Sequence, residues 1–283
     1  MRRACLFTGG AHPARCVSTG STLVGAPLAG AWVARESRPM RHSRAHRKAS
    51  SLLSHPGGSV WWAPRRASWW IGVLFAVGSA CFLVGPFPGF VHVVGAGADA
   101  AVFFVGSLFF TTAATLQYLE SVNVDRRRLR VLAFEPRRID WWATVIQLAG
   151  TLFFNLSTFH ALQTSLSTGQ EDRLIWRPDA FGSICFLVAS TLAWVEVCGV
   201  AIRGPRRQLE WWIVAVNLAG SVAFGVSAVA GYVVPATGDD LDLAAANVTT
   251  TVGALFFLAG AVLLLIEAAR ARVAPAPVPM EAT

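Results

Sequence analysis

Six long apolar runs, separated by short polar or charged connections, constrain this 283-residue chain more than any other feature. Each run is close to the roughly 20 residues that cross about 30 Å of hydrocarbon as a helix. The runs are continuous and do not alternate, which favours helices over strands. The sequence therefore predicts an all-α membrane protein with six transmembrane helices, over residues 69–93, 99–119, 141–163, 179–202, 211–234 and 245–269.

Basic residues gather on one side of these six runs. The connection 120–140 carries six arginines and 203–210 carries three, whereas 86–98 and 235–244 contain no lysine or arginine. The connection 164–178 holds two arginines beside two acidic residues. Because basic connections mark the cytoplasmic face, both termini are predicted to be cytoplasmic. The Arg- and Ala-rich composition suggests a bacterium, and hence a bacterial plasma membrane.

The first 68 residues differ from the rest, because they hold eleven of the 24 Lys and Arg residues and a single acid, Glu36. Such a segment cannot bury a core, so a disordered cytoplasmic tail is expected that anchors the topology, with binding to anionic lipid headgroups as the alternative. Translation could alternatively start at Met40, in which case residues 1–39 would not be part of the protein. Residues 270–283 form a second cytoplasmic tail. Membrane orientation accounts for the net charge of +8, so no nucleic-acid partner is predicted. The five cysteines show no Cys-x-x-Cys pair, and no disulfide is expected.

Self-comparison divides the membrane region into three hairpins, 69–120, 141–196 and 211–267. Each first helix follows a double arginine and opens with two tryptophans, which we interpret as interfacial anchors. The residue before each pair, Ser68, Asp140 or Glu210, is the expected N-cap. A Gly, then Ser or Thr, and then Phe follow at fixed spacing. The anchors are Trp69, Trp70, Trp141, Trp142, Trp211 and Trp212, and the Gly-Ser/Thr-Phe positions are Gly78, Ser79, Phe82, Gly150, Thr151, Phe154, Gly220, Ser221 and Phe224.

The second helices also align with one another. A Gly precedes a Phe by four residues and a Glu by fourteen, at Gly106, Phe110, Glu120, Gly182, Phe186, Glu196, Gly253, Phe257 and Glu267. Small residues near mid-depth allow helices to approach closely. Three parallel hairpins around a pseudo-threefold axis are expected, and an open row of hairpins is the alternative.

The third hairpin resembles a known family. Asn217 followed by Gly220-Ser221, and then an apolar helix with Gly253 and Gly260, is similar to the YrhK-like family of small two-helix bacterial membrane domains. The resemblance covers residues 211–267. It implies a type of membrane domain and carries no activity.

Few polar residues in the apolar runs could carry chemistry. Glu120, Glu196 and Glu267 could form a ring of carboxylates at the mouth of a central path, or pair with arginines and indoles at the boundary. Gln147 and Asn217 lie deeper and could bind a polar ligand or link helices. His92 and His160 could ligate haem, but no third ligand or metal spacing accompanies them. Asp99, Asp179, Asp239, Asp240 and Asp242 are expected on the outer face.

These observations favour a non-enzymatic membrane protein that packs, binds lipid or supports a partner, with no cofactor or metal. A small-solute or ion pathway along the pseudo-threefold axis is the alternative. A haem protein or membrane enzyme is a third and weaker interpretation.

Overall fold

The computed structural model describes residues 62–87, 89–123, 129–163, 165–199 and 208–270, all within one compact unit. The predictions about the two terminal tails concern residues that, apart from 62–68 and Arg270, lie outside these ranges.

Long helices make up most of the described chain, which confirms the all-α expectation. The six long ones are α2 (Ala67–Val84), α4 (Ala96–Asn123), α5 (Ile139–His160), α7 (Arg177–Cys198), α8 (Leu209–Ala230) and α9 (Leu243–Arg270). Three short pieces join them, namely α3 (Phe90–Val94), α6 (Thr168–Glu171) and the π-helical turn η1 (Asp172–Trp176). In the described segments the only extended pairing is an isolated bridge between Val233 and Asp240.

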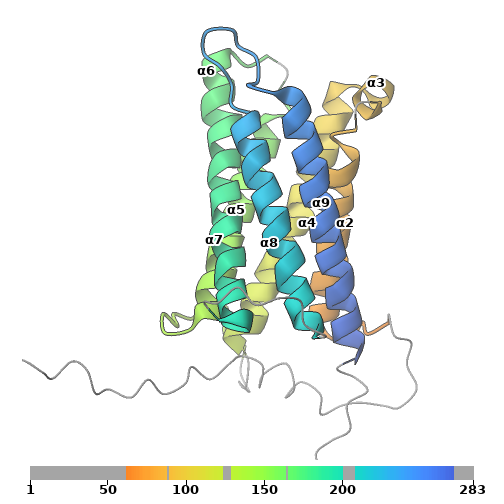
Figure 1. The fold of residues 1–283 in the computed structure, drawn as a ribbon, viewed down its shortest axis with the longest axis vertical. Helices are drawn as coiled ribbons and strands as arrows, with labels where there is room; N and C mark the ends of the chain where they lie inside the picture. The colour runs from red at the N-terminus through yellow and green to blue at the C-terminus, as the bar shows by residue number, and fades with distance from the viewer. Residues whose placement is uncertain (1–61, 88, 124–128, 164, 200–207, 271–283) are drawn as a thin grey trace, which may run out of the picture. The chain divides into compact units, whose positions relative to one another are not determined.

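The six long helices form a closed ring (Figure 1). Each packs against its neighbours in chain order, from α2 to α4, α5, α7, α8 and α9. The last helix, α9, then packs against α2 as extensively as α2 packs against α4. This contact closes the ring, so the arrangement as an open row is not the one adopted.

Five helical segments in the described part of the chain are long and apolar enough to cross a membrane. They are Ala67–Val84, Ala96–Asn123, Thr168–Cys198, Leu209–Ala230 and Leu243–Arg270. Helix α5 has 22 residues, about 33 Å by helical rise. Its sequence includes Asp140, Gln147 and Asn155, and it is not among these five segments.

Two predicted boundaries are wrong for identifiable reasons. The first helix ends at Val84 rather than near residue 93, because Pro86 cannot continue a helix. The predicted connection 164–178 is instead helical from Thr168, where Ser167 and Gln170 form a capping box. The π-helical turn before Pro178 lets the helix continue, since a wider turn tolerates the missing proline N–H.

The N-caps also differ from the prediction. Arg66, Arg138 and Gln208 occupy these positions, and none makes a side-chain capping hydrogen bond. Asp140 lies inside the first turn of α5 and binds the guanidinium of Arg138 instead. The acidic residue therefore stabilises the helix start through an ion pair and the helix dipole.

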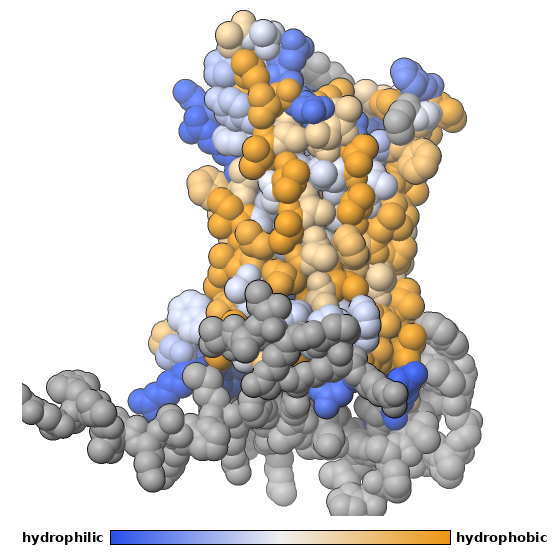
Figure 2. All heavy atoms as spheres, viewed as in Figure 1, coloured by the Kyte–Doolittle hydropathy of each residue, from blue (hydrophilic) through white to orange (hydrophobic). Residues whose placement is uncertain are grey.

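Apolar side chains cover the flank of the bundle, and polar residues gather toward its ends (Figure 2). Large hydrophobic residues remain exposed on every long helix, including Val77, Leu108, Phe153, Ile184, Val226 and Leu255. An apolar belt of this size exposed outside a bundle is typical of contact with lipid. We call the end that carries the three tryptophan pairs the tryptophan end, and the other the opposite end.

Candidate functional site

The centre of the bundle is filled by six phenylalanine rings, one from each long helix. All six are at least 92% buried and belong to one apolar cluster, made by Phe82, Phe110, Phe154, Phe186, Phe224 and Phe257 together with Ala254. Each ring comes from the Gly-x-x-x-Phe spacing found in its helix.

These rings form two layers of three. In one layer, Phe82, Phe154 and Phe224 contact one another with centroid distances of 6.0 to 6.4 Å. The other layer, from the second helix of each hairpin, has distances of 5.7 to 6.3 Å among Phe110, Phe186 and Phe257. Partners within a hairpin connect the layers at 5.2 to 5.6 Å. Most pairs are edge-on, the arrangement that aromatic quadrupoles favour.

Little space remains between the two layers. The cavity they enclose has a volume of about 10 Å³ and is lined by the six rings and Ser107. A cavity needs about 10–15 Å³ and several polar partners to hold one water. The bundle axis is therefore closed by packed aromatic rings at the level of this cluster.

Within each hairpin, the glycine of each helix lies against the phenylalanine ring of the other helix. A Cβ on Gly78 would lie 2.8 Å from the Phe110 ring, and one on Gly106 would lie 3.1 Å from the Phe82 ring. The equivalent distances are 2.9 Å from Gly150 to Phe186, 3.3 Å from Gly182 to Phe154, 3.3 Å from Gly220 to Phe257 and 2.5 Å from Gly253 to Phe224. Each glycine thus makes room for the ring of the helix opposite, so both residues are needed for the layers to form.

The residue after each of these glycines is small and buried. It is Ser79, Ser107, Thr151, Ser183, Ser221 or Ala254, in chain order. Two of the hydroxyls link neighbouring hairpins, Ser107 with Thr158 at 2.9 Å and Ser221 with Ser190 at 2.6 Å. The hydroxyls of Ser79 and Ser183 are buried and have no hydrogen-bond partner.

Sequence reasoning missed Ser107 and Ser183, although the signal was present. The second helices contain the same Gly-Ser-x-x-Phe pattern as the first, with Ala in place of Ser only at Ala254. Comparing first helices only with first helices concealed the fact that all six share one pattern.

Polar residues lie on both sides of the phenylalanine layers, three positions before each glycine. On the tryptophan side these positions are Phe75, Gln147 and Asn217, and on the other side Phe103, Asp179 and Thr250. Both phenylalanines pack onto the cluster, at 5.6 Å from Phe110 and 5.3 Å from Phe82.

Three of the polar members have distinct surroundings. The Asn217 amide lies against Gly260, where a Cβ would be 2.7 Å from its oxygen. Thr250 shares a hydrogen bond with Ser227 at 2.6 Å. Gln147 is half-buried on α5. The contacts of Asn217 and Thr250 both join α8 to α9, and linking helices is one of the two roles expected for Asn217.

The prediction that Asp179 lies at the outer face is wrong. Asp179 lies about 16 Å along the continuous helix from Thr168, because that helix begins earlier than expected. It is half-buried, one turn from Gly182. In the described residues its carboxylate makes no ion pair.

The three aligned glutamates do not form isolated charges inside the bundle. Glu120 is exposed, whereas Glu196 and Glu267 are half-buried. None of the three is without an interaction partner. His92 is exposed on α3, and His160 faces Gln163 at 3.3 Å. In the ranges that the structure describes, no three His, Cys, Asp or Glu side chains form a group able to hold a metal.

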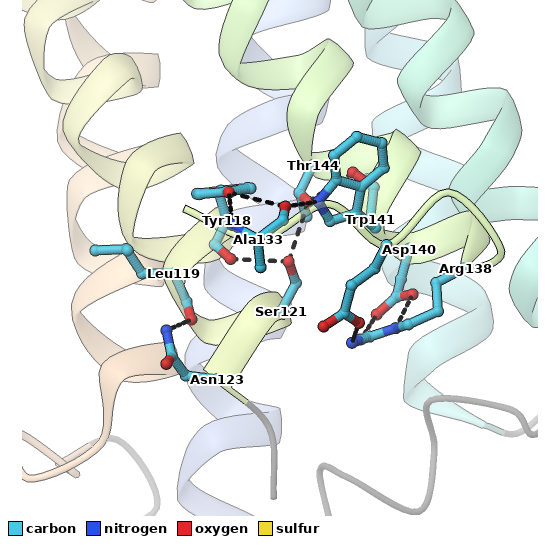
Figure 3. A network of polar contacts seen from close by, with 10 residues as sticks. Tyr118, Leu119, Ser121, Asn123, Ala133, Arg138, Asp140, Trp141 and Thr144 are labelled. Atoms are coloured by element: carbon cyan, nitrogen blue, oxygen red, sulfur yellow. Dashed lines mark hydrogen bonds and ion pairs between the residues drawn. The ribbon is translucent and has the colours of Figure 1, made fainter. Parts of the chain in front are cut away.

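At the tryptophan end, the connection between α4 and α5 is fixed by a polar network (Figure 3). Asn123 donates to the Arg130 carbonyl at 2.8 Å and accepts the Arg130 N–H at 2.6 Å. It also donates to the Leu119 carbonyl at 2.8 Å (Figure 3). The Ala133 carbonyl accepts from Trp141 at 2.9 Å, and its N–H donates to the Tyr118 hydroxyl at 3.2 Å.

The arginine of this network has two carboxylate partners. Arg138 binds Glu135 at 2.6 Å and also Asp140. Burial alone lowers the pKa of Arg138, but hydrogen bonds and the charges of Asp140 and Glu135 outweigh it and raise the pKa above its usual value.

The tryptophan pairs divide into a buried and an exposed member. Trp69, Trp141 and Trp211 are buried, whereas the residue after each is 41 to 46% exposed. Trp70 and Trp142 donate to the carbonyls of Pro64 and Pro136, in the same local arrangement. The second tryptophan of each pair is therefore the one available as an interfacial anchor.

Comparison with known proteins gives no match, whether to a family model, to a curated protein or to a solved structure. The residues and their arrangement carry the functional argument alone.

Proposed function

We propose that this chain is a non-enzymatic structural protein of the bacterial plasma membrane that binds lipid or supports a partner within the bilayer. In this proposal all six long helices cross the membrane as three copies of one hairpin, with both termini in the cytoplasm. No cofactor or metal takes part. Its resemblance to the YrhK-like family, over residues 211–267, is part of the same proposal.

One observation carries the proposal. The two phenylalanine layers fill the bundle axis and leave a cavity of about 10 Å³. The repeated glycines and phenylalanines there all have a packing role, either as a ring or as the glycine that admits it. A tightly packed aromatic core is typical of a structural membrane protein, whereas a channel or transporter needs a route that water can enter.

Flux measurements on sealed liposomes test this proposal. Purified full-length protein is reconstituted, and the leak of protons, potassium and glycerol is compared with protein-free liposomes. The proposal expects equal leak. Saturable transport above the protein-free level would contradict it.

A pathway along the axis is the second candidate, because polar residues flank the rings. Gln147 and Asn217 lie on one side, and Asp179 and Thr250 on the other, at equivalent positions. In this version the phenylalanine layers are a gate. Transport that is lost in Asp179→Asn, with normal expression, would favour it.

A further inference from the structure

The connection between α4 and α5 exposes apolar side chains where a water-facing connection would have polar ones. Leu129 is 76% exposed, Val131 64%, Leu132 85% and Phe134 76%. Four large hydrophobic residues within six positions form the surface that we call the 129–134 patch. Single exposed hydrophobic residues are common on protein surfaces, but four close together indicate a surface that binds a partner.

Hydrogen bonds hold the 129–134 patch in shape. The Asn123 side chain fixes Arg130 through both of its backbone groups, and Ala133 is fixed by Tyr118 and Trp141. These bonds use only backbone groups of Arg130 and Ala133, and none of the four apolar side chains. The exposed side chains are therefore presented outward on a fixed support, which lowers the entropic cost of binding.

The patch lies at a defined level of the bundle. Its connection extends sideways at the tryptophan end (Figure 1). The exposed Trp142 donates to Pro136, in the same connection. Tryptophan and tyrosine rings prefer the boundary between hydrocarbon and headgroups, so the patch lies at this boundary.

Arginines accompany the apolar residues. Arg130 and Arg137 are exposed, and in the described chain neither makes an ion pair, whereas Arg138 is bound by Glu135 and Asp140. Apolar side chains beside free guanidiniums match a surface whose phosphates lie directly above acyl chains.

From this we infer that the 129–134 patch inserts into the cytoplasmic leaflet, where Arg130 and Arg137 bind the phosphates of anionic lipids. This inference rests on the proposed membrane orientation of the chain. The connection that carries the patch projects from the side of the bundle (Figure 1), so a fluid lipid surface suits it better than a rigid protein.

A fluorophore at the patch tests the inference. In the full-length chain, with its five cysteines replaced, Leu132→Cys carries an NBD label and the protein is placed singly in nanodiscs. The matched control is Leu241→Cys, at an exposed position of the opposite end. The expected result is blue-shifted emission at 132, quenched by lipids with a doxyl group near the headgroup, and water-like, unquenched emission at 241.

The charge contribution has its own measurement. Adding phosphatidylglycerol to phosphatidylcholine discs should increase quenching at 132. Arg130→Gln or Arg137→Gln should each raise the phosphatidylglycerol fraction needed for half of this increase about fivefold. Arg173→Gln, an exposed arginine at the opposite end, should leave it unchanged.

Three results would overturn the inference. Water-like emission at 132 would show that the patch does not insert. Blue-shifted emission without doxyl quenching would show that protein covers it, either this chain or a second copy. Quenching that does not change with the phosphatidylglycerol fraction would show that the patch inserts without binding anionic lipids. None of these results depends on whether liposomes leak, so the proposed function would be judged separately.

Discussion

Across the α8–α9 hairpin, the ring of Phe224 lies in the space that a side chain on Gly253 would fill. A Cβ on Gly253 would lie 2.5 Å from Cδ2 of the Phe224 ring, closer than real Cβ contacts come. The ring can reach the bundle axis only because residue 253 has no side chain. The same relationship recurs in the other hairpins, so the aromatic core depends on glycines as much as on phenylalanines.

This contact predicts that Gly253→Ala destabilises the protein. Overpacking of a close-packed core typically costs about 1–3 kcal/mol. Thermal unfolding in mild detergent measures the effect. Gly225→Ala is the matched control, because a Cβ there meets nothing within 4 Å. The control should be neutral or slightly stabilising, since alanine favours helix. Adding Phe224→Leu should recover part of the lost stability, and equal loss from both glycine substitutions would contradict the account.

Two buried serines should respond differently to removal of their hydroxyls. Ser221 bonds Ser190 at 2.6 Å, so Ser221→Ala should cost about 0.6–2 kcal/mol of stability. The Ser183 hydroxyl is buried without a partner, so Ser183→Ala should be neutral or stabilising. Both variants remove one oxygen at equivalent positions, and unfolding of each in the same detergent compares them directly. The account fails on this point if Ser183→Ala is the more damaging change.

Release of the connection between α4 and α5 is the third prediction. Tyr118→Phe removes the hydroxyl that accepts the Ala133 N–H, so this backbone should become less protected. Hydrogen–deuterium exchange should rise over residues 129–138 and stay unchanged at the opposite end. Tyr232→Phe, at that end, serves as the control. Unchanged exchange over 129–138 would mean that the network does not hold the connection.

Asp240 gives a prediction about pH. Burial, with the nearby charges of Glu171 and Asp239, raises the pKa of Asp240 above the ordinary value of 3.8. Folding therefore disfavours its ionised form. The connection 231–242 should be least protected from exchange above the raised pKa, and should gain protection as pH falls through it. Below 3.8 the unfolded form is protonated too, so the gain stops there.

Asp240→Asn should reproduce this gain at neutral pH and remove the pH dependence. Because the burial of Asp240 is only partial and the residue remains largely exposed to solvent, the effect should be small and confined to this connection. A loss of protection on acidification would contradict the assigned direction.

Much of the fold follows from patterns that the chain repeats. The apolar runs predict helices, and the aligned glycines predict their closest contacts. The ring closes where α9 packs on α2, because Gly72 leaves room for Leu265 and Ala261. Helix ends were predicted less well, since they depend on single residues such as Pro86 and on the π-helical turn before Pro178.

The site was only partly predictable. The spacing in each helix identified every phenylalanine. It did not predict that six helices of alternating direction bring the rings together as two adjacent layers at the centre of the bundle. The 129–134 patch was not foreseen, because Asn123, Tyr118 and Ala133 belong to no repeat. Their importance depends on bonds between residues up to fifteen positions apart.

The most direct test of the sealed axis is cysteine accessibility from each side of a sealed membrane. Gln147→Cys and Thr250→Cys, in a chain whose native cysteines are replaced, lie on opposite sides of the phenylalanine layers. A membrane-impermeant thiol reagent is added to one side at a time, with Phe154→Ala/Phe186→Ala as the opened control. The account predicts that reagent from one side never modifies both positions unless the rings are removed. Modification of both from one side, with all six rings in place, would contradict it.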